Sequence, residues 1–223
     1  MRDDQGHGTT ADADASGTRQ FIEASEDFLA RLVKDKTVLD VGCAAHSAVR
    51  ESSDNSWLHK HLARSARSIL GLDILEAEVG ELRRRGYNMI VGDATKVTLG
   101  EKFDFVVAGE LVEHLDNPAA FLRNMAAHLN EDGRLVLTTP HVFFAYHVIE
   151  SFLWTPAQRW NAEHVAWYCP FTLGNLLRRN GLEVESCYYF TRSAKLRAIL
   201  KALHLPCYRL LATSLLVVAR PAH

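Results

Sequence analysis

Short apolar segments alternate with longer amphipathic ones through the middle of the chain. The short segments are rich in β-forming residues and are predicted strands, at Thr37–Val41, Ser68–Leu72, Asn88–Val91, Phe103–Ala108 and Arg134–Thr138. The longer segments are predicted helices, at Trp57–Ala66, Leu75–Arg85 and Pro118–Leu129. Alternation of strands with helices of about a dozen residues is typical of an α/β, doubly wound parallel sheet with helices on both faces.

The two ends of the chain extend this pattern. Apolar residues, Phe21 among them, recur at helical spacing between Arg19 and Lys34, so a helix is predicted before the first strand. After residue 169 the pattern predicts two more helices and two more strands, at Pro170–Arg179, Ser193–Ala202, Glu183–Phe190 and Leu211–Ala219. Because a short connection separates the last two strands, we expect a seven-stranded, mostly parallel sheet with one antiparallel edge strand.

Composition favours an ordinary globular protein, because 48% of the 223 residues are hydrophobic and 23% are charged. Residues 1–18 are acidic and rich in small residues, so we expect a disordered tail there and a single domain over residues 19–223. We find no signal-peptide pattern and no apolar stretch long enough for a transmembrane segment. The spacing of the cysteines fits free thiols in a cytoplasmic protein, at Cys43, Cys169, Cys187 and Cys207.

Charge is unevenly distributed although the formal net charge is only −2. No acid follows Glu185, whereas basic residues do, at Arg192, Lys195, Arg197, Lys201, Arg209 and Arg220. The acidic body offers no basic path for a phosphate chain, so nucleic acid is not the expected partner. For the basic end two hypotheses stay open, contact with an anionic partner or membrane surface and a solvated edge helix.

Acidic side chains stand where successive predicted strands end, at Asp40, Asp73, Asp93 and Glu110. Open α/β sheets bind ligands at the carboxyl ends of their strands, and Gly42 allows a tight turn there. Ala44 and His46 occupy positions where a pyrophosphate-binding turn has glycines, so a dinucleotide is disfavoured. An acidic rim suits a ligand with a positive centre and ribose hydroxyls, and S-adenosylmethionine (SAM) fits that description.

Ordered motifs along the chain resemble those of class I SAM-dependent methyltransferases, at Asp40–Cys43, Leu72–Ile74, Gly92–Ala94, Phe103–Val107, Gly109–His114 and Pro140. The segment from Asn161 through Pro170 to Leu177 is further similar to the ubiquinone-biosynthesis-like branch, methyltransferase types 11 and 23. The resemblance extends from about Thr37 to the C-terminus. It implies a Rossmann-like fold and an enzyme that transfers a methyl group from SAM.

The resemblance also implies roles for individual residues in binding SAM. Asp40, Gly42 and Cys43 would face the methionine part. Asp73 would bind the ribose hydroxyls, with Ile74 beside the adenine. A helix N-cap is the alternative explanation for Asp40.

Further along the chain, the resemblance places Asp93 at the adenine amino group, with Ala94 next to it. Gly109 and Glu110 would close the pocket. A plain turn is the alternative explanation for Asp93. His46 departs from the glycine-rich turn of the family and is a candidate to point into the site. The polar loop after it is either local recognition structure or a surface insertion.

Aromatic residues concentrate at residues 141–169, which we expect to form a cap on the acceptor side. Methyl transfer requires exclusion of water, alignment of the acceptor and, for a hydroxyl acceptor, removal of its proton. Imidazoles follow the predicted fourth and fifth strands at His114 and His141, and His164 lies late in the cap segment. Each is a candidate base, and a hydrogen-bonded structural histidine is the alternative.

Glu110, Glu113 and His114 have the spacing i, i+3, i+4, which puts them on one face of a helical turn. Together with His164 they are candidate ligands for a divalent metal that would acidify an acceptor hydroxyl. The pattern is similar to that of small-RNA 3′-end methyltransferases and some ubiquinone-pathway enzymes. The Glu–His pair is also common in metal-free members, where it shapes the SAM pocket.

These observations favour SAM-dependent O-methylation of a small-molecule acceptor, aromatic, sugar-like or a natural product. One alternative is a metal-assisted methyltransferase that acts on an RNA terminus. The other is a non-catalytic SAM-binding interaction module. The sequence identifies neither the acceptor nor an oligomeric state.

Overall fold

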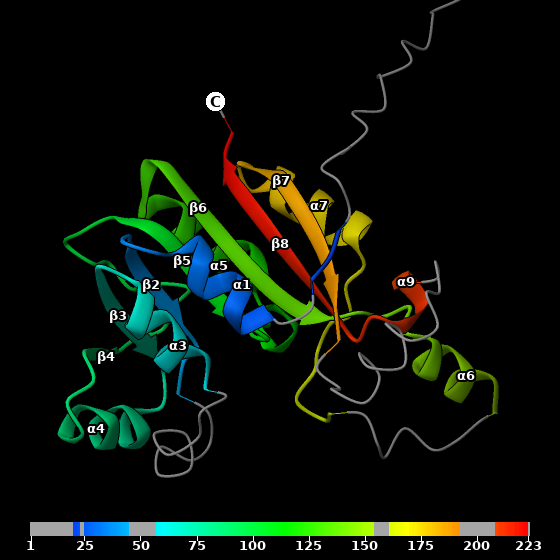
Figure 1. The fold of residues 1–223 in the computed structure, drawn as a ribbon, viewed down its shortest axis with the longest axis horizontal. Coiled ribbons are helices and arrows are strands. Elements are labelled where there is room, and N and C mark those ends of the chain that lie inside the picture. Colours follow the sequence, from blue (N-terminus) through cyan, green and yellow to red (C-terminus); the bar gives the residue numbers. More distant parts are fainter. Residues whose placement is uncertain (1–19, 23–24, 45–56, 154–160, 192–207, 223) are drawn as a thin grey trace, which may run out of the picture.

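A single mixed sheet organises the computed structural model, which describes residues 20–22, 25–44, 57–153, 161–191 and 208–222 (Figure 1). The strands are β1 (Gln20–Ile22), β2 (Thr37–Val41), β3 (Ser68–Asp73), β4 (Met89–Val91), β5 (Phe103–Gly109), β6 (Leu129–Pro140), β7 (Leu182–Phe190) and β8 (Ser214–Pro221). They lie in the order β1-β7-β8-β6-β5-β2-β3-β4. All neighbours are parallel except β8, which is antiparallel to both β6 and β7.

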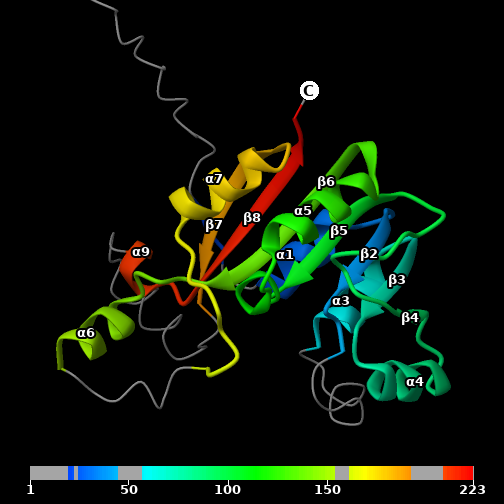
Figure 2. The ribbon, with the colours of Figure 1, turned by 180° about the vertical axis from the view of Figure 1, so that it is seen from behind.

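Helices cover both faces of this sheet, as Figures 1 and 2 show from opposite sides. The helical elements are α1 (Ser25–Leu32), α3 (Leu58–Ser65), α4 (Glu76–Arg84), η1 (Val112–His114), α5 (Pro118–Ala127), α6 (Ala145–Leu153), α7 (Pro170–Arg179) and α9 (Tyr208–Leu211). Helix α5 begins where the Asn117 side chain accepts a hydrogen bond from the Ala120 N–H, with Pro118 in the first turn.

Alternation along the strands explains why two helical layers form. Leu39 and Val41 of β2 point to one face and join a buried cluster with α5 and α7, which contribute Phe121 and Leu173. The intervening Val38 points to the other face and packs with α1 and α3. Successive side chains of a strand face opposite sides, so a strand that is apolar at nearly every position needs cover on both.

The predicted fold class is confirmed, a mostly parallel Rossmann-like sheet with an antiparallel strand near one edge. All seven predicted strands are present, and β2 has the predicted bounds. The structure adds an eighth strand, β1, which pairs with β7 at the edge of the sheet. The antiparallel β8 lies between β6 and β7.

Three predicted boundaries assign residues to the wrong kind of element. Residues 20–22, predicted as helix, form β1, because parallel pairing with β7 at the sheet edge outweighs a helical apolar spacing. Leu129, predicted as the helix end, begins β6. Leu211 ends α9 rather than starting the last strand, which begins at Ser214. Apolar periodicity is weakest at the ends of elements, where tertiary pairing decides.

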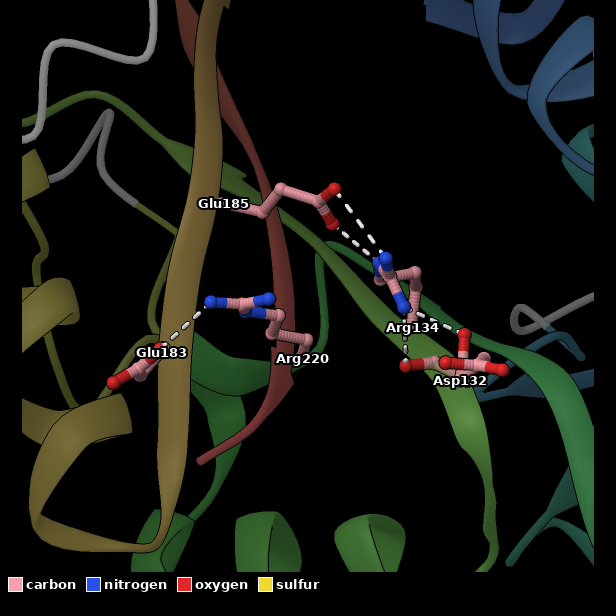
Figure 3. Close-up of polar contacts among 6 residues, drawn as sticks. Asp132, Arg134, Glu183, Glu185 and Arg220 are labelled. Carbon is pink, nitrogen blue, oxygen red and sulfur yellow. Dashed lines mark hydrogen bonds and ion pairs between the residues drawn. The ribbon is translucent and has the colours of Figure 1, made fainter. Parts of the chain in front are cut away.

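Charged pairs join the last three strands of the sheet, near the amino ends of β6 and β7 (Figure 3). Arg134 of β6 reaches over β8 to form an ion pair with Glu185 of β7. Its guanidinium also donates to the Asp132 carbonyl at 2.6 Å. Arg220 of β8 donates to Glu183 of β7 at 3.2 Å. These contacts lie at the edge of the sheet opposite to the predicted SAM site.

Several predictions concern residues outside the described ranges. They are the tail at 1–18, His46 with the loop that follows it, the basic helix Ser193–Ala202, and Cys207. The described cysteines Cys43, Cys169 and Cys187 are free thiols. Among the described residues we find no helix with both the length and the apolar character needed to cross a membrane.

Candidate active site

The carboxyl ends of four neighbouring parallel strands bring the predicted acids to one edge of the sheet. The order β5-β2-β3-β4 places Glu110, Asp40, Asp73 and Asp93 on successive strands or directly after them. Asp40 lies inside β2, opposite Gly71 of β3, and therefore does not cap a helix. The sequence predicted this gathering because parallel topology fixes which strand ends meet.

The turn after β2 requires glycine. Gly42 has a φ of 71°, a conformation that L side chains rarely adopt, and its N–H donates to the Leu72 carbonyl at 2.9 Å. A Cβ there would also lie 3.0 Å from the Leu111 side chain. The next residue, Cys43, is buried, and burial together with Asp40 and Asp73 raises the pKa of its thiol well above the ordinary value. Cys43 is therefore a packing residue and not a nucleophile.

Asp73, the residue implied for ribose binding, is only 6% exposed. Its carboxylate accepts from the Ala44 N–H at 2.8 Å and from the Leu75 N–H at 3.0 Å. Burial raises its pKa, and these backbone hydrogen bonds oppose the rise. The adjoining Ile74 is 67% exposed, so an apolar side chain stands open beside the fixed carboxylate. This combination fits a nucleoside with a polar sugar and a flat base.

A buried pair of side chains, His59 and Asp40, lies beneath this turn and was not predicted from the sequence. His59 of α3 is 1% exposed, and its Nδ1 lies 2.8 Å from Asp40 Oδ2. The His59 ring packs at 5.0 Å from Trp57, whose indole N–H donates to the Cys43 carbonyl at 2.8 Å. Ligand atoms of Asp40, Cys43 and His59 all lie within 4.8 Å of one another. No local pattern could have found the pair, since helix α3 meets β2 only in the folded chain.

Asp93 is held in a tight turn after β4. One carboxylate oxygen accepts from the Thr95 hydroxyl at 2.6 Å and the Thr95 N–H at 2.9 Å, and the other lies 2.9 Å from Lys96 Nζ. The Thr95 hydroxyl, followed by Lys96, lowers the Asp93 pKa to about 2. The backbone carbonyl of Ala94 accepts from Asn124. Asp93 thus makes the turn contacts of the alternative interpretation, and its contact with the adenine stays a prediction.

Strain marks the end of β5. Glu110, directly after Gly109, has a φ of 49°, which is rare for a residue with a side chain. Its N–H donates to both the carbonyl and the hydroxyl of Thr138, at 3.0 and 3.1 Å. A backbone held in such a conformation by its neighbours is common at functional sites.

Two predicted histidines meet next to this strained residue. The rings of His114 in η1 and His164 lie 4.7 Å apart, nearly perpendicular. The Glu113 carbonyl accepts from the N–H groups of Val165 and Ala166, which attaches the segment carrying His164 to η1. Burial is the main cause that lowers the His164 pKa, and electrostatic repulsion from the neighbouring His114 imidazole adds to it. Ligand atoms of Glu113, His114 and His164 all lie within 4.8 Å of one another.

His141 has a different environment. It follows β6, is 2% exposed, and its ring packs at 5.3 Å from Tyr189. Burial lowers its pKa to about 4, against the effect of a hydrogen bond to the backbone at Arg209. A neutral, enclosed imidazole results, which contrasts with the half-buried His114 and His164.

A shallow groove of about 410 Å³ lies at the amino ends of the strands. Its apolar floor includes Phe105 and Tyr188, and its rim includes Asp104 and Arg134. It is at the sheet edge opposite to the strand-end acids. The charged pairs of its rim hold β6 and β7 together, which is a structural role.

Comparison with known proteins identifies the family. Residues 15–187 match the Methyltransf_23 family model, whose description is methyltransferase domain. The chain belongs to the SAM-dependent methyltransferases. A methyltransferase of this kind uses SAM as its methyl donor, in agreement with the acidic strand ends.

Curated relatives of this methyltransferase domain act on different atoms. The chain is 29% identical over 117 residues to (S)-coclaurine N-methyltransferase of Papaver somniferum, covering 52% of this chain and 33% of the relative. It is 25% identical over 162 residues to the ubiquinone biosynthesis O-methyltransferase of Pseudomonas paraeruginosa, covering 67% of this chain and 66% of the relative. The chain thus spans a third to two thirds of these relatives, and they include both N- and O-methyltransferases.

Solved structures agree on the fold. A SAM-dependent methyltransferase from Mesorhizobium loti has a TM-score of 0.58 and 20% identity, over 88% of this chain and 98% of that one. The N-methyltransferase NodS of Bradyrhizobium japonicum, in complex with S-adenosyl-L-homocysteine, has a TM-score of 0.58 and 18% identity, over 89% and 86% of the two chains. At these identities the likeness extends to the fold alone.

Proposed function

We propose that this protein transfers the methyl group of SAM to a hydroxyl group of a small, largely apolar acceptor. SAM carries its methyl group on a sulfonium and supplies the activated carbon. The chain therefore has to bind the cofactor, orient the acceptor, exclude water and take up the hydroxyl proton. The observation that carries the proposal is the pairing of His164 with His114, which follows the strained Glu110 by four residues after the carboxyl end of β5.

The cofactor part of the proposal assigns SAM to the turn after β2 and the ends of β3, β4 and β5. The fixed carboxylate of Asp73 would accept from the ribose hydroxyls, and Ile74 would cover the adenine. Asp93 and Ala94 would lie at the adenine edge. Gly42 leaves room for the methionine part, since a Cβ there would already crowd Leu111. Asp40 and Cys43 support this turn from below.

Gly109 and Glu110 would close the pocket on the acceptor side, and residues 141–169 would form its cap. His164 is the proposed base, with His114 positioned against it and hydrogen-bonded at its own Nδ1 to the Glu163 carbonyl at 3.2 Å. A lowered pKa leaves His164 neutral near pH 7, the form that can accept a proton. His141 is the weaker candidate, because its ring is enclosed.

A metal-assisted mechanism is the second candidate for the same site. One carboxylate and two imidazoles, from Glu113, His114 and His164, are a donor set suited to a divalent transition metal, and they are already close together. Glu110, the fourth predicted ligand, is outside this group. Such an ion would acidify a coordinated hydroxyl. An RNA terminus is a possible acceptor only under this mechanism.

The test is a methyl-transfer assay with the full chain, SAM, catechol as the hydroxyl acceptor and phenethylamine as the amine acceptor, with products identified by mass spectrometry. We expect methylated catechol, and about a hundredfold lower turnover for His164→Gln. His61→Gln, a change on α3 away from η1, is the matched control and should retain turnover. Methyl transfer to phenethylamine and not to catechol would contradict the hydroxyl acceptor and support an amine acceptor instead.

Two further measurements separate the mechanisms. Loss of turnover with a chelator, restored by added Mn²⁺, would favour the metal-assisted mechanism. Turnover that survives chelation favours His164 as the base. Tight SAM binding measured by calorimetry, with no transfer to either acceptor, would favour the non-catalytic interaction module.

A further inference from the structure

Helix α6 has its polar and apolar faces reversed relative to an ordinary surface helix. The buried residue of α6 is the acidic Glu150, which is 8% exposed. Its Oε2 lies 4.0 Å from the Nδ1 of His147. The exposed large side chains of the helix are apolar, at Tyr146, Val148, Ile149, Phe152 and Leu153, with Phe152 at 85% and Leu153 at 70%. A helix at a water-facing surface normally buries its apolar stripe and exposes its charges. The outward face of α6 therefore suits an apolar environment.

Helix α6 lies at one end of the molecule. Both ribbon views place α6 beyond the strands, with α9 close to it (Figures 1 and 2). The chain before α6 is attached to the segment after α9, because the His141 N–H donates to the Thr213 carbonyl at 2.9 Å. Arg209 and Leu210 of α9 are both exposed. A flat surface that met α6 would thus also approach a cation on α9.

Charge in the sequence around this end is mainly positive, with Glu163 as an exposed exception. Helix α6 contains no Lys or Arg, and its one carboxylate, Glu150, is turned inward. The residues directly after it include Trp154, Arg159 and Trp160. From Ser186 to the C-terminus the sequence has basic residues and no acid. Aromatic and basic residues that flank an apolar helix face are characteristic of helices that lie at the surface of an anionic bilayer.

We propose that α6 binds flat against an anionic lipid bilayer, with Ile149, Phe152 and Leu153 entering the boundary between headgroups and acyl chains. A nine-residue helix is about 14 Å long, too short to span a bilayer but suited to lie in its interface. A second copy of the chain is a poorer occupant, since joining two such ends would bring the exposed Arg209 of the two copies toward each other. The proposal concerns where the protein binds and is independent of which atom it methylates.

The experiment is flotation of the full chain with vesicles of phosphatidylcholine alone and of phosphatidylcholine mixed with phosphatidylglycerol. We expect flotation with the mixed vesicles, weaker flotation with the neutral ones, and release by salt, which screens the basic end. Phe152→Gln combined with Leu153→Gln should reduce binding to the mixed vesicles by about tenfold or more, because two apolar side chains are lost from the buried face.

Phe171→Gln is the matched control, because Phe171 is 75% exposed on a different helix, α7. It should float like the unaltered protein. Calorimetric SAM titration of each variant shows whether the fold and the cofactor site are intact. The proposal is overturned if the unaltered protein stays out of both kinds of vesicle. It is equally overturned if light scattering shows a dimer that only the α6 variant disrupts, which would make a second copy the occupant.

Discussion

The edge of the sheet at the carboxyl ends of β2, β3 and β5, where SAM is proposed to bind (the SAM edge), and helix α6 place polar and apolar side chains in opposite ways. At the sheet edge, Asp40 and Asp73 are buried, and each carboxylate is within hydrogen-bond distance of a protein donor group. At α6, large apolar side chains such as Phe152 stand in solvent while Glu150 is buried. Burying a carboxylate is costly unless hydrogen bonds compensate, whereas exposing an apolar side chain costs little when a partner later covers it. The buried, hydrogen-bonded carboxylates of the first region thus contribute to the stability of the fold, whereas the exposed apolar side chains of α6 are the ones proposed to meet a partner surface.

The largest expected effect comes from breaking the buried pair at the SAM edge. His59→Leu leaves the Asp40 carboxylate, 2% exposed, without its imidazole partner. We expect the free energy of unfolding to fall by about 3–5 kcal/mol, as for other buried pairs that lose one member. Urea unfolding followed by circular dichroism measures it.

The double variant Asp40→Leu, His59→Leu removes both members of this pair and serves as its control. It should be more stable than His59→Leu alone, because no unpaired charge stays buried. A His59→Leu protein that unfolds at the same urea concentration as the unaltered chain would show that the pair is dispensable.

The second largest effect is expected on SAM binding at the proposed SAM edge. Asp73→Asn keeps the shape of the side chain but removes the charge proposed to accept from the ribose hydroxyls. We expect SAM affinity to fall by about a hundredfold, since two charge-assisted hydrogen bonds weaken. Isothermal titration calorimetry measures it. Asp104→Asn, at the amino end of β5, is the control and should bind SAM with unchanged affinity. Equal SAM affinity of the two variants would contradict the proposed role of Asp73.

A smaller effect is expected in the dependence of stability on pH, through His141. The His141 pKa of about 4 lies below its ordinary value of 6.5, so the unfolded chain binds more protons between these pH values. Stability should therefore be lost as pH falls from about 6.5 to about 4, by about 2 kcal/mol. His141→Gln should show a flatter dependence in urea unfolding at each pH. Identical pH curves for the two proteins would contradict this assignment.

The smallest effect is expected at α6. Phe152→Ala should change the free energy of unfolding by no more than about 0.5 kcal/mol, because the ring is 85% exposed. Phe121→Ala is the matched change in the core, where the ring is fully buried, and should cost about 3–5 kcal/mol. Thermal unfolding of both proteins checks the contrast. A large loss for Phe152→Ala would mean that α6 is part of the folding core.

Much of the fold follows from local sequence patterns. Strand β2 and helix α7 have the predicted bounds, since alternation of apolar residues and a proline at the first helical position depend only on near neighbours. The gathering of Asp40, Asp73 and Glu110 at one edge also follows, because parallel strands align their carboxyl ends. The tight turn at Gly42 was likewise predictable, because glycine is the residue that most readily adopts a positive φ.

Tertiary structure alone decided the rest. Residues 20–22 became a strand because the edge of β7 offered backbone partners, which no helical spacing reveals. His59 met Asp40, and His164 met His114, through packing of segments far apart in the chain. Helix α6 and its exposed apolar face were not predicted either, because local sequence does not reveal which side of a helix the rest of the protein will cover.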